Sequence, residues 1–236
     1  MANTNDNNTQ VMIQPEVKKS HKTVLLFGDS IFDNAVYVRG KNSVIQHLTK
    51  KISEHYDGTS VSAKAHLFAH DGDVISNVSE QLEKVSAEIK EETTHVFISC
   101  GGNDGLRALN SIMWSNYYNP FTLTSTLWNL YWSVEEDYEE MMKQITTVFK
   151  DKQITVCTIY TPNFSAGAQQ FLSKAGLLFL NSIIRSKAAK YNAKVIDLYD
   201  LFTDATFLAN PIEPGVKGGD IITDHMMQII KESDSL

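Results

Sequence analysis

Apolar runs alternate with segments of helical period along most of the chain, and this alternation predicts an α/β fold. Residues 23–27 read Thr-Val-Leu-Leu-Phe, a run that favours a parallel strand buried on both faces. The segment 42–56 has apolar side chains at helical spacing, and residues 61–68 return to strand character. A strand, a helix and a second strand in this order predict a βαβ unit.

The alternation continues toward the end of the chain. Apolar residues recur every three or four positions over 74–89, which predicts one amphipathic helix packed on the sheet. The remaining elements that we expect are strands at 95–100, 154–160 and 194–199 and helices at 127–148, 167–190 and 216–231. Five strands separated by helices indicate a single three-layer α/β/α domain built on a five-stranded parallel sheet with right-handed crossovers.

Composition and charge narrow the class of protein. Of the 236 residues, 42% are hydrophobic, which is enough for one substantial core. Residues 1–21 are rich in Asn, Thr and Asp, so we expect a disordered tail followed by one domain over 22–236. A net charge of −7 argues against a nucleic-acid partner. With neither a signal peptide nor a membrane span in the sequence, a cytoplasmic protein is expected.

One serine lies where polar residues follow the first apolar run. Open α/β sheets bind ligands at the C-terminal ends of their strands, so Ser30 is placed where a substrate would bind. A serine acts as a nucleophile only when a base takes its proton and hydrogen-bond donors stabilise the oxyanion. Ser30 is therefore our candidate nucleophile, and the rest of the chain must supply its partners.

Two further polar segments follow predicted strands. Gly72 comes after the second strand in His-Asp-Gly-Asp, and Asn103 comes after the third in Gly-Gly-Asn-Asp. Together with Gly-Asp-Ser at 28–30, these segments resemble the GDSL or SGNH hydrolases, a flavodoxin-like family of esterases, lipases, thioesterases and carbohydrate deacetylases. The resemblance covers most of residues 23–230 and implies the SGNH-hydrolase fold.

The resemblance also implies a role for each of these residues. It makes Ser30 the nucleophile, and the oxyanion hole would consist of the backbone N–H groups of Ser30 and Gly72 and the side-chain amide of Asn103. Neutral donors of this kind stabilise the negative charge on the reacting oxygen, and each is worth about 3 kcal/mol. No cofactor and no metal are expected.

The last block of the sequence departs from the family pattern. Such hydrolases end with Asp-x-x-His before the last helix, where the His is the base and the Asp orients it. Here residues 210–214 read Asn-Pro-Ile-Glu-Pro, so Glu213 occupies the His position and Asn210 the Asp position. The sequence resembles a variant branch that combines this ending with Gly-Asp-Ser-Ile-Phe-Asp-Asn at the start.

The base therefore has several candidates. Glu213 would accept the proton if burial raised its pKa from an unperturbed value of about 4.3, with Asn210 holding its carboxylate. His70 lies on the correct edge of the sheet, whereas His225 falls about two turns into the last helix. The remaining possibility is that the protein has lost hydrolysis and kept the pocket.

Residues 106–132 contain all three tryptophans of the chain together with several other aromatic residues. These rings anchor an irregular segment on the core, form an apolar lid beside Ser30, or do both with different rings of the set. In the second interpretation Trp114 and Tyr118, together with Asp29, bind the substrate.

The function that these observations favour is an esterase-type serine hydrolase that cleaves a small acyl ester. The alternative is a catalytically weak or inactive protein of the same fold that binds an apolar small ligand. A metal-dependent hydrolase built on Asp29, Asp71, Asp73 and Asp104 has little support, because no His or Cys is spaced for a metal site.

Overall fold

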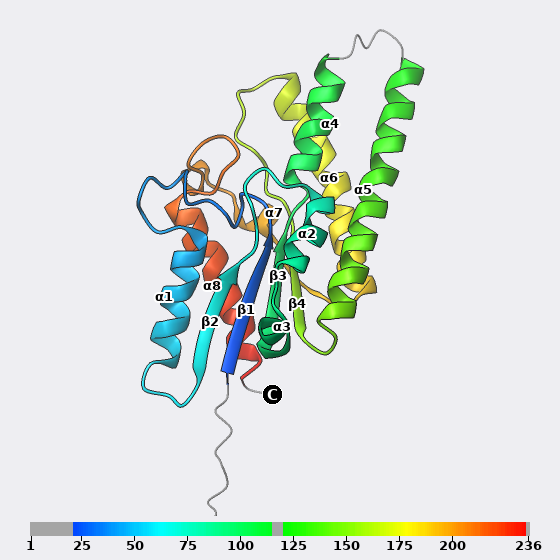
Figure 1. Ribbon diagram of the computed structural model, residues 1–236. Helices are drawn as coiled ribbons and strands as arrows, with labels where there is room; N and C mark the ends of the chain where they lie inside the picture. Colours follow the sequence, from blue (N-terminus) through cyan, green and yellow to red (C-terminus); the bar gives the residue numbers. More distant parts are fainter. Residues whose placement is uncertain (1–20, 115–119, 235–236) are drawn as a thin grey trace, which may run out of the picture.

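The computed structural model describes residues 21–114 and 120–234, and its centre is one parallel sheet (Figure 1). The sheet order is β2-β1-β3-β4-β5, and every neighbouring pair of strands is parallel. The α/β fold with a five-stranded parallel sheet that the sequence predicts is therefore confirmed. The strands are β1 His21–Gly28, β2 Ser62–Leu67, β3 Thr93–Ser99, β4 Gln153–Cys157 and β5 Lys194–Ile196.

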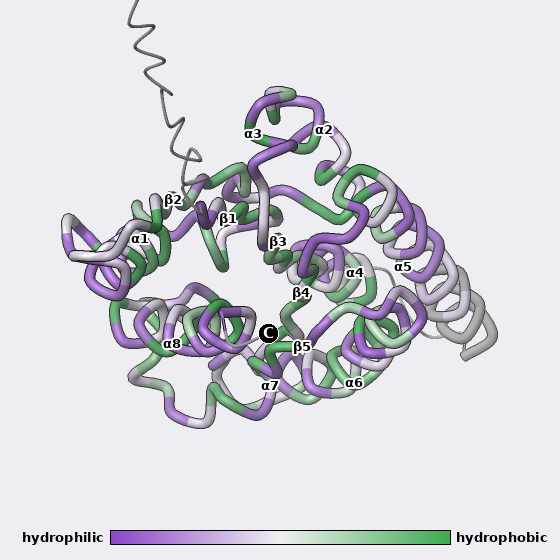
Figure 2. Tube along the Cα trace, turned by 90° about the horizontal axis from the view of Figure 1, so that it is seen from below, coloured by the Kyte–Doolittle hydropathy of each residue, from purple (hydrophilic) through white to green (hydrophobic). Residues whose placement is uncertain are grey.

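Helices cover both faces of this sheet. Figure 2 shows α1 and α8 together on one side and α2, α3, α5 and α6 on the other. Among the helices of the described chain, none combines the length and apolarity needed to cross a membrane. The helices are α1 Val44–Tyr56, α2 Val78–Glu83, α3 Ala87–Glu92, α4 Gly102–Trp114, α5 Pro120–Val148, α6 Ala168–Lys190, α7 Leu198–Leu201 and α8 Val216–Glu232, with short 3-10 helices η1 Ile75–Asn77 and η2 Ala205–Phe207.

The strand β1, which lies between β2 and β3 in the sheet, contributes to the core. Residues 24–27 are completely buried, as a strand covered on both faces requires. Each fully buried side chain of this kind contributes roughly 2 kcal/mol to folding. Phe27 stacks on Phe68 with ring centroids 5.5 Å apart, which ties the end of β1 to the loop after β2. Because β1 pairs with both β2 and β3, its C-terminal end meets the ends of both neighbours.

The prediction of a single helix over 74–89 is wrong, because this stretch forms η1, α2 and the beginning of α3. Ser86 starts α3 by accepting a hydrogen bond from the N–H of Ile89 at 3.3 Å. The apolar positions keep their role, since Val78 and Leu82 are buried. A broken helix buries the same stripe as a continuous one, so periodicity alone does not reveal the break.

Residues 106–132 are helical wherever the structure describes them, so the prediction of an irregular segment is wrong for those residues. The helix α4 continues to Trp114, and α5 begins at Pro120. Proline suits the first turn of a helix, because the N–H that it lacks would have no helical partner at that position.

The last two strands are shorter than expected. β4 stops at Cys157 and β5 at Ile196, before the predicted ends. The Asp197 carboxylate accepts the N–H of Asp200 at 3.4 Å and caps α7, so the backbone enters a helix directly after β5.

The aromatic side chains described in α5 differ in burial. Trp128 is 62% and Trp132 46% exposed, and their rings meet edge to face with centroids 5.6 Å apart. Of the described rings between 106 and 132, Tyr131 packs against the core. The two aromatic substrate-binding candidates, the Trp114 side chain and Tyr118, lie outside the described residues.

The two ends of the described chain meet at the N-terminal edge of the sheet. Lys22 forms an ion pair with Asp234, and its Nζ donates to the Ser233 hydroxyl at 3.1 Å. Tyr56 at the end of α1 donates its hydroxyl to the same Asp234 carboxylate at 2.7 Å. These contacts tie β1, α1 and the end of α8 together at the edge opposite to Ser30.

We predict that Gly28→Ala destabilises the protein severely. Gly28 has a φ of +130°, and a Cβ atom there would lie 1.9 Å from the carbonyl oxygen of Ser99. The free energy of unfolding, measured with urea, should fall by more than about 3 kcal/mol, or soluble protein should be lost. Gly58→Ala is the matched control, because Gly58 has a φ of +70° but open space around it, and should cost about 1 kcal/mol. Equal losses in both variants would contradict the prediction.

Candidate active site

The chain turns sharply after β1 and sets Ser30 at the C-terminal edge of the sheet. The positive φ of Gly28 lets the backbone pass close to Ser99 of β3. The side-chain carboxylate of Asp29 then accepts the N–H of Ile31 at 3.0 Å. The backbone carbonyl oxygen of Asp29 accepts the N–H groups of Phe32 and Asp33. Within the described residues no hydrogen bond uses the N–H of Ser30. This N–H is thus available to a ligand.

The loop after β2 presents the N–H of Gly72. The N–H of Asp73 donates to the carbonyl of His70 at 3.2 Å, and Gly72 is the third residue of this turn with a φ of +86°. A type II turn needs a positive φ at that position, which explains the glycine. Space is open where a Cβ of Gly72 would lie, and its N–H has no acceptor in the part of the chain that the structure describes.

Asn103 lies in the first turn of α4, directly after β3. Its Nδ2 donates to the carbonyl oxygen of Asp73 at 2.8 Å, and the neighbouring Asp104 carboxylate accepts the N–H of Ile75 at 3.1 Å. These two bonds join the start of α4 to the loop that carries Gly72. An amide nitrogen has two hydrogens, so Asn103 keeps one for another acceptor.

The sequence-predicted oxyanion donors therefore meet at one edge of the sheet. Ser30 follows β1, Gly72 follows β2 and Asn103 follows β3, and these three strands are neighbours in the sheet. Parallel strands end at the same edge, so the loops that follow them converge.

The segment before α8 fixes the backbone around Glu213. Tyr160 donates its hydroxyl to the carbonyl of Ile212 at 2.6 Å, and Asn34 donates its side-chain amide to the carbonyl of Pro214 at 2.9 Å. Both donors are almost completely buried, so their positions are set by the core. The residues on either side of Glu213 are thus held by two separate elements of the fold.

Asn210 also acts on this segment through the backbone. Its Oδ1 accepts the N–H of Ile212 at 2.9 Å and the N–H of Glu213 at 2.8 Å. The sequence suggests that Asn210 holds the Glu213 carboxylate, whereas the structure shows its side-chain oxygen bonded to two backbone N–H groups. Asn210 therefore shapes the turn that presents Glu213.

Glu213 reaches Ser30 with its side chain. Both residues are buried, with 5% and 6% of their surface exposed. Burial raises the pKa of Glu213, a hydrogen bond with the Ser30 side chain lowers it, and the Asp71 carboxylate raises it further, with a net increase. Its Oε2 is buried and has no hydrogen-bond partner among the described residues. Glu213 is thus a desolvated carboxylate in contact with the candidate nucleophile.

A second buried acid lies beneath this pair. Asp29 is 2% exposed, and burial raises its pKa to about 8, opposed by the hydrogen bond from Ile31 and reinforced by the charges of Glu213 and Asp104. The sequence places Asp29 among the substrate-binding residues; in the structure this residue is buried, and its carboxylate accepts the N–H of Ile31. Near neutral pH the Asp29 carboxyl retains its proton in most molecules.

Neither histidine considered as a base contacts Ser30. The side chain of His70 is 70% exposed, and its Nδ1 lies 3.5 Å from an oxygen of Asp73. His225 lies within α8, as the sequence predicts. In the described part of the chain, no hydrogen bond joins Ser30 to an imidazole, whereas a hydrogen bond with the Ser30 side chain contributes to the pKa of Glu213.

The four aspartates of the metal interpretation each have a protein donor. Asp29 and Asp104 accept backbone N–H groups, Asp71 accepts the hydroxyl of Tyr37 at 2.7 Å, and Asp73 accepts the side-chain amide of Gln81 at 2.8 Å. Across the two described ranges, no group of three His, Cys, Asp or Glu residues is arranged to hold a metal ion. These carboxylates anchor the loops of the site.

Three buried residues that support the site were not found from the sequence. Asn34 and Tyr160 hold the Glu213 segment, and Gln81 contacts both the end of β1 and Asp73. Gln81 left one signal, since it is a polar residue on the apolar face that Val78 and Leu82 define. Asn34 belongs to the motif at the start of the chain, but the motif does not reveal its partner.

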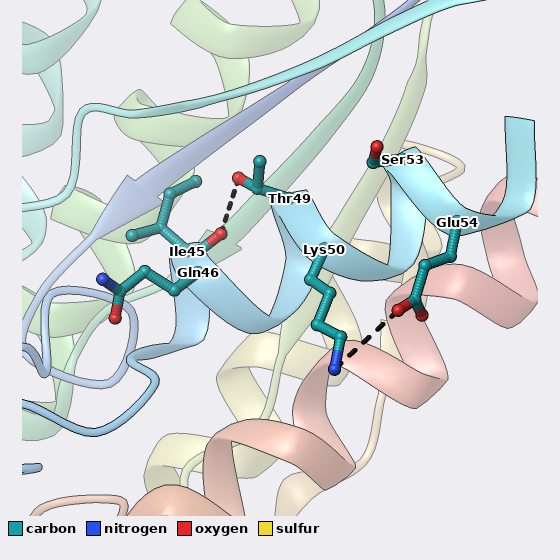
Figure 3. A pocket seen from close by; sticks show the side chains of 6 residues that line it. All are labelled: Ile45, Gln46, Thr49, Lys50, Ser53 and Glu54. Atoms are coloured by element: carbon teal, nitrogen blue, oxygen red, sulfur yellow. Dashed lines mark hydrogen bonds and ion pairs between the residues drawn. The ribbon is translucent and has the colours of Figure 1, made fainter. Parts of the chain in front are cut away.

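A surface hollow elsewhere on the molecule does not belong to this site. It is lined by six residues of α1 and includes none of the candidate residues (Figure 3). Its lining residues are Ile45, Gln46, Thr49, Lys50, Ser53 and Glu54.

The chain matches one protein family over most of its length. The sequence model of the GDSL-like Lipase/Acylhydrolase family matches residues 26–216, a range that includes Ser30, Gly72, Asn103 and Glu213. No curated protein sequence is similar enough to this chain to count as a relative.

Solved structures show the same fold at low sequence identity. The lipase Lip_vut3 from a goat rumen metagenome is 16% identical, with a TM-score of 0.67 over 89% of this chain and 96% of its own. The lipase/acylhydrolase from Enterococcus faecalis is 19% identical, with a TM-score of 0.59 over 90% and 96%. The esterase EstA from Pseudoalteromonas sp. is 19% identical, with a TM-score of 0.54 over 91% and 99%. At these identities the likeness establishes the fold.

We predict that Asp29→Asn flattens the pH dependence of stability. The folded protein keeps a proton on Asp29 up to about pH 8, whereas the unfolded chain releases it near the ordinary pKa of 3.8. The stability that this carboxyl contributes is therefore lost as pH rises through this window, by at most about 1.4 kcal/mol per pH unit. Urea unfolding of both proteins from about pH 5 to about pH 8 measures it. A wild-type stability that falls no more steeply than that of the variant would contradict the assignment.

Proposed function

Because this chain belongs to the GDSL-like lipase/acylhydrolase family, we propose that it is an esterase-type serine hydrolase in which Glu213 takes the place of the usual histidine. The observation that carries the proposal is the contact between the Ser30 hydroxyl and a buried carboxylate whose pKa is raised. A base must touch the proton that it removes and must have a pKa close to the working pH. The hydrogen bond between Glu213 and the Ser30 side chain supports the first condition, and the raised pKa of Glu213 supports the second.

In the proposed reaction, Ser30 Oγ attacks the carbonyl carbon of a small acyl ester and passes its proton to the Glu213 carboxylate. The carbonyl oxygen becomes an oxyanion, which the N–H groups of Ser30 and Gly72 and the amide of Asn103 stabilise. Collapse of the tetrahedral intermediate expels the alcohol, which takes the proton from Glu213. Water then repeats the sequence on the acyl-enzyme, with Glu213 as base, and releases the acid and free Ser30.

The raised pKa of Glu213 is what makes this chemistry feasible. An ordinary carboxylate is too weak a base for a serine proton at neutral pH. Burial and the nearby Asp71 both disfavour the charged form, which increases the tendency of Glu213 to accept a proton. The proposed enzyme should still be slower than one with an imidazole base, because the gap between the two pKa values remains large.

We predict that a fluorophosphonate labels Ser30. Such a probe needs a nucleophilic serine and an oxyanion hole. EstA from Pseudoalteromonas sp. has a structure inhibited by monoethylphosphonate, which supports the choice of probe. Mass spectrometry of the intact protein and its peptides should show one adduct, on Ser30. Ser30→Ala should abolish it, whereas Ser60→Ala, at an exposed serine, should not.

Absence of labelling in folded protein over a range of pH would refute the nucleophile assignment. It would favour the alternative function, an inactive protein of this fold that binds an apolar ligand in the same pocket.

We predict that Glu213→Gln lowers kcat by about 10²- to 10⁴-fold, since glutamine keeps the shape but accepts no proton. In the wild-type protein, kcat/KM for a p-nitrophenyl ester should rise with pH through the raised pKa of Glu213, because only the carboxylate is a base. Activity is thus lost as pH falls through that value. The exposed His70 provides the control, and His70→Asn should retain both activity and pH profile. If the fall of kcat/KM at low pH disappeared in His70→Asn, the base would be the histidine.

A further inference from the structure

Gln81 is a buried amide to which the proposed reaction gives no role. It lies in α2 and has no exposed surface. Burial of an amide is unfavourable unless its donors and acceptors find partners, and an apolar side chain would fill the same position without that requirement. We therefore expect the hydrogen bonds of Gln81 to have a specific role at this position in the core.

The hydrogen bonds of Gln81 connect two loops of the candidate active site. Its Oε1 accepts the N–H of Gly28 at 2.8 Å, and its Nε2 donates to the carbonyl of Gly28 at 2.7 Å. The same Nε2 donates to the carboxylate of Asp73 at 2.8 Å. Gly28 precedes the turn that carries Ser30, and Asp73 directly follows Gly72.

Asp73 extends this connection to the third loop. Its carbonyl oxygen accepts the side-chain amide of Asn103 at 2.8 Å. One continuous set of hydrogen bonds, through Gly28, Gln81, Asp73 and Asn103, thus links the segments that present the three oxyanion donors. We call this set the Gln81 clamp.

The clamp acts where β1 and β2 are no longer paired. Their pairing ends at Leu26 and Leu67, although β1 stays paired with β3 as far as Gly28. Beyond Leu67 individual hydrogen bonds hold the loop after β2 to β1, among them the bond from the N–H of His70 to the carbonyl of Gly28 at 3.1 Å. Those of Gln81 are made from inside the core, so they fix both loops to α2.

We propose that Gln81 is a positioning residue for the oxyanion hole, which sets the N–H of Gly72 and the amide of Asn103 relative to Ser30. This inference rests on the proposed function. Oxyanion donors must lie within about 2.7–3.1 Å of the developing charge, and displacements of about 0.5 Å already weaken them. Loosening the clamp should therefore reduce kcat, because the oxyanion exists only after attack, and leave KM almost unchanged.

The first test compares two substitutions of Asp73, whose side chain is 24% exposed. Asp73→Ala removes the acceptor for Gln81, whereas Asp73→Asn keeps a side-chain oxygen that Gln81 reaches. We expect Asp73→Ala to lower kcat for a p-nitrophenyl ester by about tenfold or more with KM within about twofold of wild type. Asp73→Asn should stay within about threefold in kcat. Equal kcat values in the two variants would overturn the proposal.

The second test reverses the direction of the hydrogen bond. Gln81→Glu places its carboxylate against that of Asp73 and against the carbonyl oxygen of Gly28, and should lower kcat more than Asp73→Ala does. Adding Asp73→Asn supplies an amide donor to the new carboxylate but leaves the Gly28 carbonyl without its donor, so the double variant should regain part of the lost kcat. A residue needed only for folding would show losses that follow the melting temperature, with no rescue, and that outcome would also overturn the proposal.

Failure of the proposed function is recognised separately. If the wild-type protein is neither labelled at Ser30 nor active on esters, the hydrolase assignment fails, and the clamp is tested through backbone amide NMR shifts. The N–H resonance of Ser30, which is distant in sequence from position 73, should move more in Asp73→Ala than in Asp73→Asn. Equal shifts of this resonance in the two variants would show that the clamp does not position Ser30 relative to the other donors.

Discussion

The close approach of β1 to β3 is the constraint on which the site depends. At the end of β1 the carbonyl oxygen of Ser99 occupies the space of a side chain on residue 28, so only glycine fits. The N–H of Asp29 then donates to that same carbonyl at 3.0 Å, which keeps the two strand ends together past the last ladder pair. The turn that follows presents Ser30 to the edge of the sheet. A wider separation of the strands would remove both the turn and the convergence of the loops.

The charge balance of the proposed reaction explains why asparagine suits position 210. A histidine base becomes positive when it takes the serine proton, and a neighbouring aspartate stabilises that charge. Glu213 instead becomes neutral, so an aspartate beside it would have no positive charge to stabilise. An asparagine can still accept the backbone N–H groups of Ile212 and Glu213. The negative charge simply moves from Glu213 to the oxyanion, and the protonated Asp29 beneath adds no second charge near neutral pH.

The sequence predicts the parts of this protein that depend on local pattern. Apolar runs locate the strands, and the order of elements fixes a parallel sheet with Ser30, Gly72 and Asn103 at its C-terminal edge. The break between α2 and α3 escapes the pattern, because a capped break and a continuous helix bury the same side chains. Partners distant in sequence escape it too: Gln81 is 53 residues from Gly28 and Asn34 is 180 residues from Pro214. No periodicity links such pairs: the sequence marks Gln81 only as a polar residue on an apolar face, and Asn34 only as part of a motif.

The ion pair between Lys22 and Asp234 bears on how the chain could be re-engineered. Because the two ends of the described chain meet at the edge of the sheet opposite to Ser30, a short linker would span them without crossing the site. The same sheet can therefore form from a chain in which the elements follow one another in a different order. A circularly permuted chain, with its new ends in an exposed loop such as the one around Gly58, meets this condition. Attachment of either end to a surface would leave the edge that bears Ser30 facing the solution.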